Sequence, residues 1–233
     1  MIKKTIQHLL AKEYFKLYLI LAISLWMSIG LSFFRMGLTS SKTFFFLNWN
    51  LFLAFLPFAL SVLMFANKER LYQQRLVLLA LGCLWLLFFP NAPYIATDLL
   101  HLRQRPMIPY WYDVLLLLSF AWNGLLLGFL SLIYIQKMVT EQWGTKIGWG
   151  FSAIALVLCS FGIYLGRYLR WNSWDILSDP LGLAQDIADR FLHPFAHPRT
   201  IGVTLFFSVF LIVGYLTLYV LSNSSIQRQK IED

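Results

Sequence analysis

The sequence predicts an all-α integral membrane protein with six transmembrane helices, the third of them broken at Pro90 and Pro93, and a surface amphipathic helix before the last span. Three observations predict this class. Of the 233 residues, 59% are hydrophobic and 18% aromatic, and only 13% are charged, where soluble domains carry about 25%. The apolar residues form six runs, most of them near the roughly 20 residues that cross a bilayer. No Asp, Glu, Lys or Arg interrupts any run.

We expect one membrane domain over residues 1–233, because the spans follow one another along the whole chain. A basic cytoplasmic lead-in occupies 1–16, and 167–200 forms an outer loop with an amphipathic helix at 179–192. The expected spans lie at about 17–34, 44–66, 76–102 (broken), 114–135, 147–166 and 201–221.

Other protein classes are excluded by where the charges lie. The net charge of +8 does not predict nucleic-acid binding, because the basic residues lie between apolar runs rather than on one solvated face. The run 17–34 is not a signal peptide, since no small-residue cleavage site follows it. Cys83 and Cys159 both lie within apolar runs, so they do not indicate a redox compartment.

The ends of the spans predict an orientation. With six spans, eleven Lys and Arg residues fall on the side of the termini and eight on the other side. Positive residues favour the cytoplasmic side, so we expect a bacterial cytoplasmic membrane protein with both termini inside. The lead-in 1–16 is interpreted either as an amphipathic segment on the membrane surface or as a frayed basic tail.

The third span is interrupted. Residues 76–89 are 14 in number, or roughly 21 Å of helix, too short to cross. Pro90 and Pro93 follow, and a proline in a helix removes one hydrogen bond. Asn91 is a plausible N-cap for a second short helix, whose amides could bind an anion. The alternative is a proline kink satisfied by neighbouring helices.

The short helix after the break carries a polar face. Thr97, Asp98 and His101 stand at i, i+3 and i, i+4 spacings. Asp98 and His101 are candidate catalytic residues, as an acid–base pair, or candidate metal ligands. The alternative is an interfacial helix with solvated polar residues.

Further polar residues fall on the same predicted outer side. Asp113 and Asp175 are candidate catalytic residues that would orient the pair, and Arg167 and Arg170 suit a phosphate or carboxylate. An aromatic belt with snorkelling arginines is the alternative. The candidate substrate-binding residues are Arg167, Arg170, Asn91, Trp171, Asn172 and Trp174.

The loop before the last span contains a predicted surface helix. Asp179 caps it and Pro180 occupies its first turn, and we expect it on the outer leaflet. His193 and His197 are weak metal candidates, because a proline follows each and disfavours the helix that would align them.

Small residues predict where spans pack. Gly124 and Gly128 in the fourth span, and Gly162 and Gly166 in the fifth, allow close approach, so we expect these two spans to pair. Asn123 is interpreted as interhelical glue rather than as a substrate ligand.

These motifs resemble a known family. Pro-Asn-Ala-Pro-Tyr at 90–94, Trp-Tyr-Asp at 111–113 and Gly-Arg-Tyr-Leu-Arg-Trp-Asn at 166–172 resemble a bacterial multi-pass membrane-protein family catalogued as domain of unknown function 1361. The resemblance implies a bacterial cytoplasmic membrane. It offers no activity and no catalytic residue.

Three functions remain open. The first is an outward-facing site of Arg, Asp and His that binds or processes an anionic, lipid-linked substrate. The second is an accessory protein whose outer loops dock a partner. The third is a transporter, which the lack of ionisable residues near the midplane disfavours. The lipid bilayer is the one partner predicted. The sequence identifies no cofactor, metal or protein partner, and it does not decide whether the protein is an enzyme.

Overall fold

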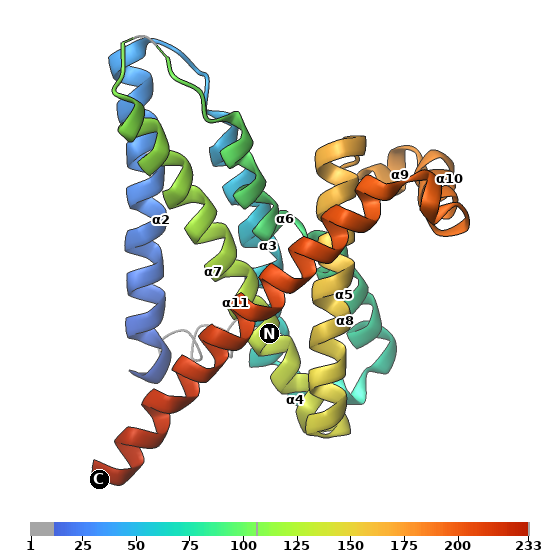
Figure 1. The fold of residues 1–233 in the computed structure, drawn as a ribbon. Coiled ribbons are helices and arrows are strands. Elements are labelled where there is room, and N and C mark those ends of the chain that lie inside the picture. Colours follow the sequence, from blue (N-terminus) through green and yellow to red (C-terminus); the bar gives the residue numbers. More distant parts are fainter. Residues whose placement is uncertain (1–11, 106, 233) are drawn as a thin grey trace. The chain divides into compact units, whose positions relative to one another are not determined.

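The computed structural model describes residues 12–105 and 107–232, and every regular element in that part of the chain is helical (Figure 1). The all-α prediction is confirmed. Within the described residues six helices are long and apolar enough to cross a membrane. They are Phe15–Thr39, Phe46–Ala66, Arg75–His101, Tyr110–Trp143, Thr145–Leu169 and Pro198–Ser222. The predicted lead-in lies mostly outside the described residues, so its two interpretations stay open.

The chain forms two compact units, which are described separately: unit 1 is Met1–Met138 and unit 2 is Val139–Asp233. Unit 1 contains α2 (Lys12–Thr39), α3 (Phe46–Ala66), α4 (Lys68–Gln73), α5 (Arg75–Phe88), α6 (Asn91–Tyr94), η1 (Ile95–His101) and most of α7 (Tyr110–Trp143). Unit 2 contains the end of α7, then α8 (Thr145–Tyr164), η2 (Leu165–Leu169), α9 (Asp175–Ser178), α10 (Pro180–Leu192), η3 (Pro194–Ala196) and α11 (Pro198–Glu232).

The core of unit 1 lies between α2, α3 and α7. Fully buried side chains from α3 and α7, such as Leu47 and Phe120, form one hydrophobic cluster with Ile95 of η1. Polar side chains then tie the helices together. Asn123 of α7 donates to the carbonyl oxygen of Ser24 and the hydroxyl of Ser28, both on α2. Asn123 therefore joins α7 to α2 by interhelical hydrogen bonds, as predicted.

The third span is interrupted where the prolines predicted it. The α-helix ends at Phe88, and after α6 the chain continues as a 3-10 helix. Asn91 is not an N-cap: Pro90 holds that position, and the Asn91 side chain donates to the carbonyl oxygen of Phe88. The amides of Ala92 and Tyr94 are also bonded, to the carbonyl oxygens of Phe89 and Pro90. The α-helix gives way to a 3-10 helix, but the amides of Ala92 and Tyr94 stay hydrogen-bonded. Those two amides are therefore not available to an anion.

This interrupted segment rests on α7. A Cβ built on Gly124 would lie 2.4 Å from the carbonyl oxygen of Ala92, and one built on Gly128 would lie 3.4 Å from Pro93 Cδ. This glycine face therefore receives the 92–95 backbone, and whether the fourth and fifth spans also pack together stays a prediction. Two prolines leave that backbone irregular, and only a residue without a side chain lets it approach so closely.

In unit 2 the end of α7 and α8 form a tight hairpin. Gly144 turns the chain with a φ of 90°, a conformation that glycine adopts readily. Gly148 faces Thr140 so closely that an added Cβ would meet the Thr140 hydroxyl oxygen. The surface helix is confirmed as α10, with the Asp179 side chain accepting from the amide of Gly182 and Pro180 in the first turn.

Candidate functional site

In unit 1 the predicted pair Asp98 and His101 does come together. Both lie on η1, and a 3-10 helix places residues i and i+3 directly above one another. The Nδ1 atom of His101 is 3.8 Å from Oδ1 of Asp98, whose side chain is 2% exposed, whereas that of His101 is 46% exposed. The pair thus joins a buried carboxylate to an imidazole that solvent can reach.

A third residue fixes the carboxylate. Asn50 of α3 donates from Nδ2 to Oδ2 of Asp98 at 2.7 Å, so each carboxylate oxygen faces a different neighbour. The His101 ring packs on its other side against Phe46, with ring centroids 5.4 Å apart. The Thr97 hydroxyl donates to the carbonyl oxygen of Tyr94.

Asp113 has a different partner. Arg35 of α2 makes a two-pronged contact with its carboxylate, from Nε to Oδ1 at 2.6 Å and from Nη2 to Oδ2 at 3.1 Å. Arg35 is 3% exposed and Asp113 1% exposed. A buried bidentate ion pair between two helices holds them together. This favours a structural role for Asp113 over the predicted catalytic one.

The positive charges at this end are organised around Phe44. The guanidinium carbon of Arg35 lies 4.7 Å from the ring centroid, and that of Arg105 lies 5.0 Å from it. Phe44 also neighbours Phe46, whose ring packs on His101. Lys42 and Arg103, on the two loops that meet here, are exposed. We call these residues the polar cluster of unit 1: Arg35, Lys42, Phe44, Phe46, Asn50, Asp98, His101, Arg103, Arg105 and Asp113.

The arrangement has the parts of an acid–base site. A partly exposed imidazole can take and return a proton, and a buried carboxylate beside it can orient the ring and stabilise its charged form. Catalytic hydrogen bonds are often long before substrate binds, so a gap of 3.8 Å is compatible with this task. The surrounding cations exceed the carboxylates, which suits an anionic substrate.

Among the candidates of unit 2, Asp175 and Asn172 stabilise a turn. The Asp175 carboxylate accepts from the amide and the side chain of Asn172 and from the hydroxyl of Ser178. The backbone hydrogen bond from Asn172, assisted by the Ser178 and Asn172 side chains, lowers the pKa of Asp175. A structural role in this turn therefore accounts for the polar side chains of Asp175 and Asn172 without a bound substrate.

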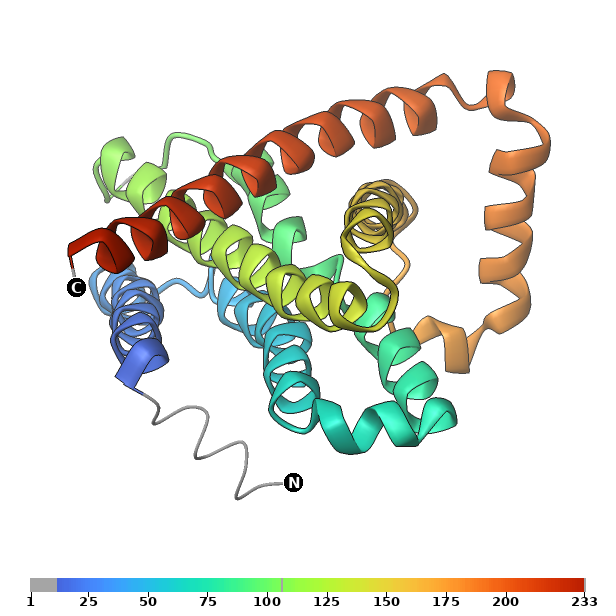
Figure 2. The same cartoon turned by 90° about the horizontal axis from the view of Figure 1, so that it is seen from below.

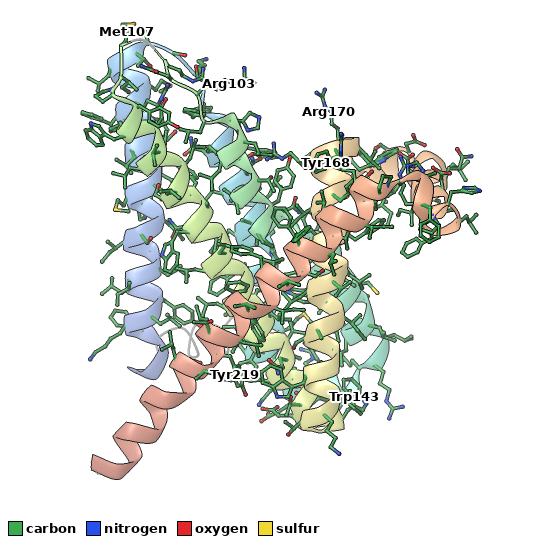
Figure 3. All side chains as sticks on the ribbon, viewed as in Figure 1. Arg103, Met107, Trp143, Tyr168, Arg170 and Tyr219 are labelled. Carbon is green, nitrogen blue, oxygen red and sulfur yellow. The ribbon has the colours of Figure 1, made fainter. Side chains whose placement is uncertain are left out.

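The predicted pairing of Arg167 and Arg170 on one helix face is wrong. The last turns of this span are a π-helix, which ends at Leu169, and Arg170 adopts a left-handed conformation with φ 65°. Figure 3 shows Arg170 pointing beyond the end of the helix, whereas Tyr168 lies lower along it. The i, i+3 spacing that suggested a shared anion site therefore does not apply.

The two tryptophans differ in their contacts. Trp171 donates from Nε1 to Oδ2 of Asp186 on α10 at 2.7 Å, and Arg190 completes this group through Oδ1 of Asp186 at 2.7 Å. Trp174 is 42% exposed. Whether the unit 2 candidates meet Asp98 and His101 stays a prediction.

His193 and His197 share one carboxylate. Nδ1 of His193 lies 3.0 Å from Oδ1 of Asp189, and Nε2 of His197 lies 2.7 Å from Oδ2. Among the residues that the structure describes, no group of three or more His, Cys, Asp or Glu is arranged to hold a metal ion. The contacts favour a structural role in which Asp189, His193 and His197 join the end of α10 to the start of α11, and we call these three residues the Asp189 clip.

This clip gives a pH prediction. Hydrogen bonds from His193 and His197 lower the pKa of Asp189. A lowered carboxyl pKa contributes stability above the unfolded pKa of about 3.9, and that stability is lost as the pH falls through the folded value. We expect the bonded amide protons of His193, Ala196 and His197 to stay protected down to about pH 4 and to lose protection below it. Hydrogen exchange measures this, and Asp189→Asn should lower protection above about pH 4 and make little difference well below it, where the Asp189 carboxyl is protonated.

Several residues of the polar cluster were not identified as functional from the sequence. Arg35 marked only the end of a span, and Asn50 was one of few polar residues inside the bilayer. Arg35 and Asp113 are 78 positions apart, so no local spacing relates them. Arg105 and Phe44 lie on loops whose approach depends on how α2, α3 and α7 pack. The one available signal was the arginine at the very end of an apolar run, because an arginine close to the bilayer core requires a partner.

Comparison with known families gives one finding. The chain matches the family described as "Protein of unknown function (DUF1361)" over residues 49–213, which includes α5, η1, α8 and α10. Comparison with curated proteins and with solved structures gave no match. The match covers well over half of the sequence, from α3 into α11. The chain is therefore a member of the DUF1361 family.

Proposed function

We propose that this multi-pass protein binds and processes an anionic, lipid-linked substrate at the polar cluster of unit 1. The proposal places it in a bacterial cytoplasmic membrane with both termini in the cytoplasm, so that the polar cluster faces outward. The Lys and Arg bias between the two sides of the spans supports this orientation. Six apolar helices support the membrane setting.

One observation carries the proposal: Asp98 is buried and held by Asn50, with the half-exposed His101 beside it. Burying a carboxylate is costly, and a purely structural role would not require a reachable imidazole next to it. His101 acts as the general base or acid, and Asp98 is a positioning residue that acts through His101. Arg103 and Arg105 attract the anionic group of the substrate.

The cations are tested by binding. Purified protein in nanodiscs is titrated with phosphatidic acid, phosphatidylglycerol and phosphatidylcholine. We expect the two anionic lipids to bind more tightly, and Arg103→Ala with Arg105→Ala to weaken that preference, because each removed cation near the surface contributes about 1 kcal/mol. Equal binding of all three lipids, unchanged in the double variant, would contradict the proposal.

The acid–base pair is tested by turnover. Phosphate release from phosphatidic acid and farnesyl diphosphate is followed with His101→Asn and Asp98→Asn, which should each lose about 100- to 10,000-fold in rate. The matched control is Glu69→Gln, which makes the same carboxylate-to-amide change on exposed α4. Rates that fall equally in all three variants would show that the loss does not come from the site.

A further inference from the structure

The segment that joins α8 to α11 in unit 2 begins and ends at membrane spans. The fifth span ends at Leu169 and the sixth begins at Pro198. Between them lie α9, α10 and η3. If α8 and α11 each cross the bilayer once, both ends of this segment lie at the same membrane surface.

Within unit 2, α10 runs across the axis of α8. Figure 2 shows α8, in gold, nearly end-on, while α10, in orange, is seen along its length. In Figure 3 the α10 region lies near the height of Tyr168, below the tip of Arg170. The contacts of Trp171 with Asp186, and of Phe191 with Phe161 at 5.5 Å between ring centroids, fix it there. If α8 crosses the bilayer, α10 lies in the membrane plane.

Two of the three charged side chains of α10 are turned inward, and the third, Asp189, is 45% exposed. The side chain of Arg190 is 12% exposed and that of Asp186 34% exposed, and the two are bonded to each other. The apolar Leu181 and Leu192 are 75% and 74% exposed. A helix that faces water on its outer side shows the reverse pattern, so this outer face suits an apolar environment better than water.

Exposed apolar side chains continue beyond both ends of α10. Leu177 on α9 is 86% exposed, and Phe195 on η3 is 92% exposed. Between them, Ala184 and Ala188 are exposed on the helix itself. We call this set the apolar face of α9–η3: Leu177, Leu181, Ala184, Ala188, Leu192 and Phe195.

We infer that the apolar face of α9–η3 is immersed in the boundary between headgroups and acyl chains of the bilayer that α8 and α11 span. Continuity supports lipid as the occupant. The two flanking helices expose apolar side chains of their own, Leu158 on α8 and Leu205 and Phe206 on α11 among them, and a helix in the membrane plane buries its apolar face at that depth. The inference concerns unit 2 and is independent of the polar cluster.

Spin labels test the inference. In a background with Cys83→Ser and Cys159→Ala, single cysteines replace Leu181, Leu192 or Phe195, and the full-length protein is placed in nanodiscs. We expect collisions with oxygen to exceed collisions with a water-soluble nickel chelate at all three positions. Arg170→Cys, at the exposed helix end, should show the opposite order, and Ile187→Cys, on the inner face, should show low values for both.

Two results would overturn the inference. Higher nickel collisions at 181, 192 and 195 would place the face in water, and low collisions with both reagents would show that a protein surface covers it. The unmodified protein provides a check that needs no substitution. Hydroxyl-radical labelling in nanodiscs should spare Leu181, Leu192 and Phe195 relative to Trp174, and heavy labelling of all three would also contradict the inference.

Discussion

Replacing Asp113 with leucine lowers the free energy of unfolding by about 3–5 kcal/mol, because it leaves Arg35 buried without its counter-charge. Both side chains are almost fully buried, and the pair joins α2 to the start of α7. Arg35→Met should cost a similar amount, since the Asp113 carboxylate then lacks its cation. Unfolding of the purified protein in a defined bilayer measures both values.

The double variant Arg35→Met with Asp113→Leu distinguishes a fastening from a catalytic group. Replacing a buried ion pair by apolar residues is often neutral, so we expect the double variant to regain most of the lost stability and to keep its activity. Lys42→Met, at an exposed cation, is the control and should change stability by less than about 0.5 kcal/mol. A stable but inactive double variant would restore Asp113 to the catalytic residues.

Replacing Gly124 with alanine also destabilises unit 1. The new methyl group would lie 2.4 Å from the carbonyl oxygen of Ala92, which is backbone and cannot rotate away. Overpacking of this kind costs about 1–3 kcal/mol. The displacement of η1 should also separate Asp98 from Asn50, so turnover should fall together with the melting temperature.

Gly30→Ala is the matched control for this variant. Gly30 lies within α2, and an added Cβ there has no atom within 4 Å, so alanine should be neutral or stabilising by up to about 1 kcal/mol. If Gly124→Ala proved as stable as Gly30→Ala, the backbone at Ala92 would not pack against Gly124 of α7 as described.

The sequence predicted the features that depend on local chemistry. Asp179 caps α10 and Pro180 follows it, because a cap and a first-turn proline act within a few residues. The interruption at Pro90 follows from the missing amide alone. Both features rest on residues that are neighbours in the chain.

The features that were missed depend on packing between distant segments. The sequence did not show that Gly124 would face Ala92, since any small-residue stripe accepts any close helix. The π-helix at Leu165–Leu169 and the left-handed conformation of Arg170 remove the ordinary helical spacing of Arg167 and Arg170, although the residues themselves fit an ordinary helix. Asn50 joins Asp98 across 48 positions, and one sequence cannot show which amide meets which carboxylate.

Photo-crosslinking tests the central proposal most directly. A phosphatidic acid with a diazirine near its headgroup is irradiated with the protein in nanodiscs, and the adducts are mapped by mass spectrometry. Our account predicts adducts concentrated on 40–50 and 98–109, displaced by unlabelled phosphatidic acid and reduced in Arg103→Ala with Arg105→Ala. An identical pattern from the matching phosphatidylcholine probe, with no reduction in the double variant, would contradict an anion site at His101.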